Sequence, residues 1–227
     1  RSTLFPYTTL FRSPYSRLID LLSADVAPVR PLRSPTRRAL ETLALLAALG
    51  ALAILLLPDS NPLAVRGTGE KVQAGMELAA MLATGTLAVV GAFHLSIPGR
   101  SRRWLALPLL SFAAWLMLSG VGCYRDFILR GSAGLEFGHS VDCLVFILGA
   151  SLLLGAPLIW RLSRAAPIDP LPVAALGGLG AAAFSAFLLQ FFHPFAVTFL
   201  DLAVHLVAIA IVIGLTALLK RPILRPA

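Results

Sequence analysis

The residue types best suited to chemistry in this sequence are thiols and imidazoles, which gather in its second half. They are Cys123, His139, Cys143, His193 and His205. Thiolate sulfur and imidazole nitrogen are the ligands that soft or borderline metal ions prefer, and two thiols can also be oxidised to a disulfide. Asp201 lies four residues before His205, where its carboxylate could orient the ring of a metal ligand. The alternative is structural: two small buried cysteines and a hydrogen-bonded aspartate–histidine pair.

The elements that must position these groups are long apolar runs. Of the 227 residues, 58% are hydrophobic and 13% are charged, and the mean hydropathy is +0.85, a composition typical of membrane proteins. Runs without any charged residue lie at 42–57, 78–97, 104–121, 143–160, 171–192 and 202–219. A helix needs about 20 apolar residues to cross a bilayer, and a crossing segment must satisfy its own backbone hydrogen bonds. The predicted fold is all-α, an integral membrane bundle of six helices.

The sequence before the first run has three parts. Residues 1–13 contain TLFPYTTLFRS, the in-frame translation of a common sequencing adapter, so we set them apart as an artefact and expect the natural start to be missing. Apolar residues then recur at every fourth position, at Leu18, Leu22 and Val26, which predicts a short amphipathic helix. Prolines follow and predict an extended linker. The resulting domains are a cytoplasmic tail at 14–38, the six-helix domain at 39–220 and a short basic cytoplasmic tail at 221–227.

The short helix is expected to need a partner. A helix of nine to eleven residues is too short to be stable alone in water, so it should order only on another surface. A helix that lies on a membrane carries basic residues on its polar side, whereas this one carries Asp20 and Asp25. A groove on another protein is therefore favoured over the lipid surface.

The lysines and arginines between the apolar runs predict how the bundle lies in the membrane. Beyond residue 13, thirteen of them fall in the tails and in the second-to-third and fourth-to-fifth connections, and four fall elsewhere. Because basic loops stay in the cytoplasm, both termini are expected there, in a multi-pass protein of the bacterial inner (cytoplasmic) membrane. Cys123 and Cys143 then open and close an outward connection in an oxidising compartment. A disulfide closing such a loop contributes roughly 3 kcal/mol.

Motifs of enzyme catalysis are absent from the sequence, which holds no G-x-S-x-G, H-E-x-x-H, P-loop or C-x-x-C pattern. We therefore expect a protein that is not an enzyme, has no small-molecule substrate and does not bind nucleic acid directly. We expect no cofactor, unless a soft or borderline metal ion binds as a signal. The alternatives are a small membrane carrier or a haem- or quinone-binding redox protein with His193 and His205 as ligands, and a purely structural assembly subunit.

Several stretches, taken in order, resemble the NrsF family of six-span membrane anti-sigma factors, the negative regulators of sigma F. They are LIDLLSAD, GCYRDF, FGHSVDCLVFI, AAPIDP, GGLGAAAFSAF and FFHPFAVTFLDLAVH. The resemblance implies that the N-terminal cytoplasmic segment holds an extracytoplasmic-function (ECF) sigma factor inactive. It also implies that Cys123 and Cys143 take part in sensing oxidative or heavy-metal stress. The docking residues would be four apolar and two acidic side chains, namely Leu18, Ile19, Leu22 and Val26 with Asp20 and Asp25.

Overall fold

The computed structural model describes residues 15–24, 31–56, 68–131, 137–192 and 198–218. Every regular element in these ranges is a helix, so the predicted all-α class is confirmed. The chain divides into two compact units, residues 1–32 and 33–227. The described part of the first unit is one short helix, and the second unit holds all the longer ones.

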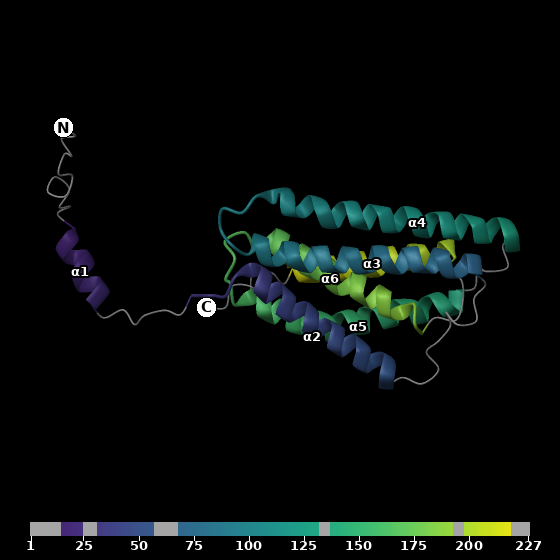
Figure 1. Ribbon diagram of the computed structural model, residues 1–227, viewed down its shortest axis with the longest axis horizontal. Coiled ribbons are helices and arrows are strands. Elements are labelled where there is room, and N and C mark those ends of the chain that lie inside the picture. Colours follow the sequence, from purple (N-terminus) through teal and green to yellow (C-terminus); the bar gives the residue numbers. More distant parts are fainter. Residues whose placement is uncertain (1–14, 25–30, 57–67, 132–136, 193–197, 219–227) are drawn as a thin grey trace. The chain divides into compact units, whose positions relative to one another are not determined.

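The short helix of the first unit is α1, Ser16–Ala24, drawn in purple in Figure 1. None of its residues is buried. Leu18, Leu21 and Leu22 are 51%, 65% and 66% exposed, respectively. α1 lies where the sequence predicts a short amphipathic helix, and within the first unit its leucines are exposed.

The second unit is a bundle of long helices. They are α2 (Pro35–Leu56), α3 (Thr68–Leu95), α4 (Ala106–Arg130) preceded by the 3-10 turn η1 (Arg102–Leu105), α5 (Phe137–Ser163), α6 (Pro170–Leu189) and α7 (Phe199–Leu218). Among the described residues, six helices are long and apolar enough to cross a membrane. Each of them contains most of one apolar run, so the predicted number and order of the long apolar helices are confirmed.

Helix α6 lies at the centre of this bundle. Fourteen of its 20 residues are buried, and it packs against α3, α5 and α7 (Figure 1). Small side chains make this possible, because a Cβ added to Gly180 would lie 3.0 Å from Val89 of α3. One added to Gly178 would lie 3.0 Å from the Cα of Ile213 on α7. Such close backbone approach is the usual way in which membrane helices associate.

The connection between the third and fourth spans is shorter than the sequence predicts. α4 continues through Cys123 to Arg130, and α5 begins at Phe137 and contains Cys143. The expectation that the two cysteines bracket a long loop is therefore wrong, since both lie inside helices. No glycine or proline interrupts residues 123–130, and α4 ends only at Gly131. That residue has φ +65°, a conformation that favours glycine and stops the helix.

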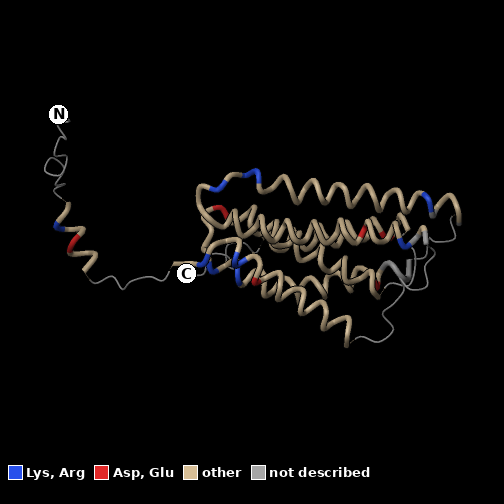
Figure 2. Tube along the Cα trace, in the orientation of Figure 1, with Lys and Arg blue, Asp and Glu red and all other residues tan. Residues whose placement is uncertain are grey.

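The two ends of the bundle differ in charge. Figure 2 shows lysines and arginines gathered where α2 begins and α5 ends, which we call the arginine end after Arg38 and Arg161. α4 ends and α5 begins at the opposite end, which we call the cysteine end after Cys123 and Cys143. The bundle therefore separates the predicted sensing residues from the point where the N-terminal tail joins α2.

Candidate functional site

The first candidate surface is the apolar side of α1. Successive residues of a helix are about 100° apart, so Leu18, Leu21 and Leu22 fall within one sector. Ile19 is 60% exposed and widens that sector, while Asp20 projects from the opposite side. Four large apolar side chains are thus presented together on a helix that buries none of them.

The docking residues predicted from the sequence are only partly described. Leu18, Ile19 and Leu22 lie on α1 as expected, whereas Asp25 and Val26 lie outside the described residues. Leu21 belongs to the same apolar side, although the fourth-position pattern does not include it. Its spacing of three from Leu18 is an equally good helical signal and could have identified it.

The second candidate site is the pair of cysteines, both of which are buried thiols. Cys123 on α4 is 2% exposed and Cys143 on α5 is 1% exposed. Each lies six or seven residues from the end of its helix, or roughly 10 Å along the axis. Both thiols therefore lie at a similar depth below the cysteine end.

Helix α7 connects the surroundings of the two thiols. It packs against both α4 and α5. Among the described residues, α4 and α5 are not closely packed against each other. Cys143 lies in a small apolar cluster with Ile147, Leu189 of α6 and Ala208 of α7. A change of volume at Cys143 would therefore press on α6 and α7, while the predicted disulfide with Cys123 stays a prediction.

A buried polar contact lies next to Cys123. Gln73 Nε2 of α3 donates to Glu77 Oε1 and to the Leu118 carbonyl of α4, both at 2.8 Å. Glu77 is 7% exposed, and a Cβ added to Gly122 would lie only 2.9 Å from its Oε1. The glycine beside Cys123 thus lets α4 approach this pair, so a shift of α4 would disturb the contact between α3 and α4.

Asp201 and His205 begin helix α7. The Thr198 backbone N–H and Oγ1 donate to Asp201 Oδ2 at 3.0 and 2.8 Å, and the Asp201 N–H donates to Thr198 Oγ1 at 3.2 Å. This reciprocal pattern is a capping box, which satisfies the free donors of the first turn. His205 Nδ1 lies 2.6 Å from the Asp201 backbone carbonyl. The structure thus places the pair in the hydrogen-bonded arrangement of a helix start.

The metal site predicted from cysteines and histidines depends on two residues that cannot be placed. His193 and the side chain of His139 lie outside the described residues. Among the side chains that are described, no three of Cys, His, Asp and Glu gather into a group that could hold a metal ion. Metal binding by Cys123, Cys143 and His205 with those histidines stays a prediction.

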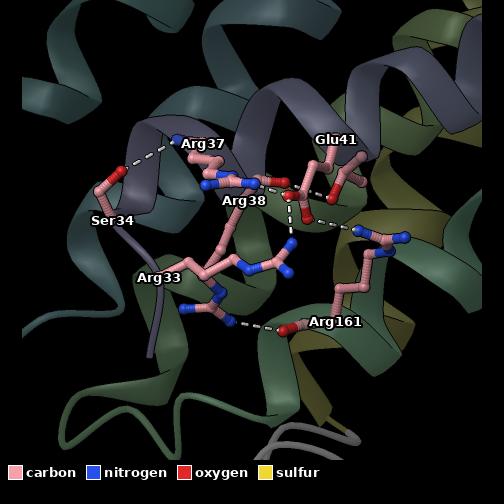
Figure 3. Close-up of polar contacts among 7 residues, drawn as sticks. Arg33, Ser34, Arg37, Arg38, Glu41 and Arg161 are labelled. Atoms are coloured by element: carbon pink, nitrogen blue, oxygen red, sulfur yellow. Dashed lines mark hydrogen bonds and ion pairs between the residues drawn. The ribbon is translucent and has the colours of Figure 1, made fainter. Parts of the chain in front are cut away.

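The third candidate site is a charged network at the arginine end, shown in Figure 3. Glu41 Oε1 accepts hydrogen bonds from Arg33 at 2.6 Å and from Arg37 at 3.2 Å. Its Oε2 lies 3.6 Å from Arg161 of α5. Ser34 caps α2 by accepting a hydrogen bond from the Arg37 N–H at 3.4 Å. The first residues after the tail are therefore fixed to the bundle by charge.

Aromatic contacts hold the same end. Arg38 is 9% exposed and its guanidinium lies 5.0 Å above the ring of Phe93 on α3. The rings of His94 and Trp104 stack with 4.0 Å between their centroids, and His94 Nε2 lies 3.4 Å from Thr36 Oγ1. The start of α2 is thus held by α3 and α5, while η1 packs on the same end of α3.

Comparison with protein families identifies the chain. Residues 22–225 match the model of NrsF, described as negative regulator of sigma F. The chain belongs to this family. The match begins inside α1 at Leu22 and includes all six long helices and both cysteines, so the resemblance inferred from the motifs is confirmed. Comparisons with curated proteins and with solved structures give no match.

Membership in the NrsF family makes the chain a negative regulator whose partner is a sigma factor. Sequence patterns identified α1 and the cysteines, but they treated the arginines only as markers of orientation. The four-residue spacing of Arg37 and Glu41 could have identified one pair of the network around Glu41. The contact with Arg161 could not be predicted, because it depends on the packing of α2 against α5.

Proposed function

We propose that this NrsF-family chain is a membrane anti-sigma factor that sequesters an ECF sigma factor through α1 and the residues that follow it. The observation that carries the proposal is the exposure of Leu18, Ile19, Leu21 and Leu22 on the apolar side of α1. Large exposed apolar groups of this kind mark interaction sites in soluble segments. A nine-residue helix is marginal alone, so α1 would become ordered as its apolar side enters a hydrophobic groove of the sigma factor.

Both the leucines and the aspartates contribute to this proposed complex. Burying a leucine contributes about 1.5–3 kcal/mol, and a micromolar complex requires about 8 kcal/mol. Leu18, Leu21 and Leu22 supply a comparable amount before the cost of ordering the segment. Asp20 and Asp25 would pair with basic residues at the rim of the groove, where charges mainly steer association.

In the proposed arrangement the six helices cross the bacterial inner membrane with both termini in the cytoplasm. The six long apolar helices and the basic residues at the arginine end support it (Figure 2). Basic segments are retained on the cytoplasmic side, which would place the tail beside a cytoplasmic sigma factor. The cysteine end would then lie toward the exterior, where thiols meet oxidants and metal ions first.

In the proposed switch, oxidation or metal binding at Cys123 and Cys143 lowers the affinity of the chain for the sigma factor. Cys143 is close-packed by Leu189 and Ala208, so a sulfur that gains a bond must displace α6 or α7. Beside Cys123, Gly122 brings α4 against Glu77, which would pass movement on to α3. A disulfide contributes roughly 3 kcal/mol, enough to shift a two-state equilibrium about a hundredfold.

The binding proposal is tested by capture of the ECF sigma factor on the purified full chain. Leu22→Asp should reduce affinity at least about tenfold, because it places a charge in the apolar contact. Ser23→Asp is the matched control, since it adds the same charge next to that position and leaves the leucines in place. Equal capture by the two variants would exclude α1 as the docking helix.

The switch proposal is tested with a reporter of sigma-dependent transcription under oxidant or metal stress. Cys123→Ser and Cys143→Ser should each keep repression in unstressed cells, since serine is nearly isosteric with cysteine. Both should lose most of the induction that the unaltered protein shows. Full induction in the double variant would show that the signal enters elsewhere in the chain.

A further inference from the structure

An apolar groove runs along α2 on the side facing the bundle. Its volume is about 440 Å³. Its walls come from four helices and include Leu43, Ala47 and Ile54 of α2, Leu82 of α3, Leu154 of α5 and Phe187 of α6. The α2 wall alone, from Leu43 to Ile54, spans roughly 16 Å along the helix axis. A hydrocarbon chain matches a lining of this kind.

The arginine network lies at one end of this groove. Glu41 lies roughly 3 Å before Leu43 along the axis of α2, although on another side of that helix. Arg161 is two helical turns after Leu154 on α5. Residues seven apart share a helix face, so α5 presents Arg161 and a wall residue of the groove on the same side. The same two helices thus supply both the apolar lining and the charged group at its end.

The charges of this network do not balance. The guanidinium groups of Arg33, Arg37 and Arg161 contact the single carboxylate of Glu41, and Arg38 adds a fourth that joins the cluster through Arg161. Arg38 is 9% exposed, and its Nη2 donates to the Arg161 carbonyl at 2.7 Å. A cluster with this excess of positive charge is suited to an additional anion.

One buried hydrogen-bond donor of the cluster has no acceptor among the described residues. Arg161 Nε is buried and has no hydrogen-bond partner among the described residues. Guanidinium groups bind phosphate through two parallel hydrogen bonds, one of them commonly from Nε. Arg33 and Arg37 have exposed side chains, 61% and 66%, so they are accessible at the rim of the cluster.

We propose that this groove and cluster form a binding site for an anionic phospholipid. The phosphate binds the guanidinium groups around Arg161 and Arg37, and an acyl chain lies in the groove beside α2. Basic pockets between membrane helices bind anionic headgroups in this way. Because the N-terminal tail joins the bundle here, the lipid fixes the helix from which the tail extends. This site rests on the proposed membrane arrangement of the six helices, but it is separate from α1 and does not depend on the proposed capture of a sigma factor.

The test is a lipid titration on the full chain purified in neutral detergent. Dioleoyl phosphatidylglycerol should bind tightly, dioleoyl phosphatidylcholine at least about tenfold more weakly, and inorganic phosphate should not displace the lipid at equal concentration. Each guanidinium near a headgroup is worth about fivefold in affinity, so Arg37→Gln with Arg161→Gln should weaken phosphatidylglycerol binding about 25-fold. Arg100→Gln with Arg103→Gln, which removes two exposed arginines outside the cluster, should change it less than twofold.

A second variant tests the groove and not the charges. Ala47 is exposed on the groove wall, so Ala47→Phe fills the groove without entering the core. It should weaken binding of the dioleoyl lipid at least about fivefold and leave the thermal unfolding midpoint of the lipid-free protein unchanged. Equal binding of the two lipids, equal effects of the two arginine pairs, or no effect of Ala47→Phe would each overturn the lipid site. Displacement by inorganic phosphate at equal concentration would show a simple anion site.

Discussion

Helices α1 and α6 are both rich in apolar residues, yet their surroundings are opposite. Fourteen of the 20 residues of α6 are buried, whereas α1 buries none. α6 is covered by three other long helices, while the described residues of the first unit leave the leucines of α1 exposed. Apolar content alone therefore does not show whether a helix packs in the core of the bundle or remains exposed for another protein to bind.

The difference comes from the size and arrangement of the side chains. α6 carries glycine and alanine around its whole circumference, so neighbouring helices can approach it from every side. α1 carries large leucines on one side and polar residues on the other, which suits a one-sided contact. We infer that α6 sets the stability of the bundle and that α1 can change its partner without disturbing it.

The largest loss of stability is expected when a large residue is placed at the centre of α6. Gly178→Leu would force a side chain against Thr216 and into the backbone of α7 at Ile213, destabilising the bundle by about 3 kcal/mol or more. Gly149→Leu is the matched control, because its Cβ would meet nothing within 4 Å. Unfolding in detergent measures both. Equal midpoints would show that α6 does not set the stability of the bundle.

A smaller effect on stability is expected from a polar contact between α5 and α6. Ser151 of α5 donates to Ser185 Oγ at 3.1 Å, and Ser185 donates to the Ala181 carbonyl at 2.8 Å. Ser185→Ala removes the acceptor of Ser151 and should destabilise the bundle by about 0.6–1 kcal/mol. The double variant with Ser151→Ala should recover part of this loss. If the unaltered protein, Ser185→Ala and the double variant all unfold at the same midpoint, this contact does not stabilise the bundle.

The sequence predicts the helices well because their signals are local. A run of about 20 apolar residues identifies a membrane helix, and the fourth-position spacing of Leu18 and Leu22 identifies α1. The end of α4 is different, because polar residues such as Arg125 lower the hydropathy while the backbone remains helical to Arg130. Hydropathy measures how well a segment suits a lipid environment, so it cannot locate the end of a helix that extends beyond the apolar run.

The sites are less predictable because they depend on which helices pack together. The sequence indicates Cys123 and Cys143 as a pair, but it cannot show that α7 is the neighbour that their helices share. Glu41 and Arg161 meet only because α2 lies against α5 in the folded bundle. Most of the apolar side of α1 could be predicted because it depends on residue spacing within one helix alone.

The most direct measurement of the central claim is site-specific photo-crosslinking from α1 in the full chain. A photo-reactive residue at Leu21, 65% exposed on the apolar side, should capture the sigma factor in cells before stress and lose it after stress. The same residue at Ser23 should capture much less. Strong crosslinks from Ser23 with none from Leu21, or none from either, would contradict sequestration by the apolar side of α1.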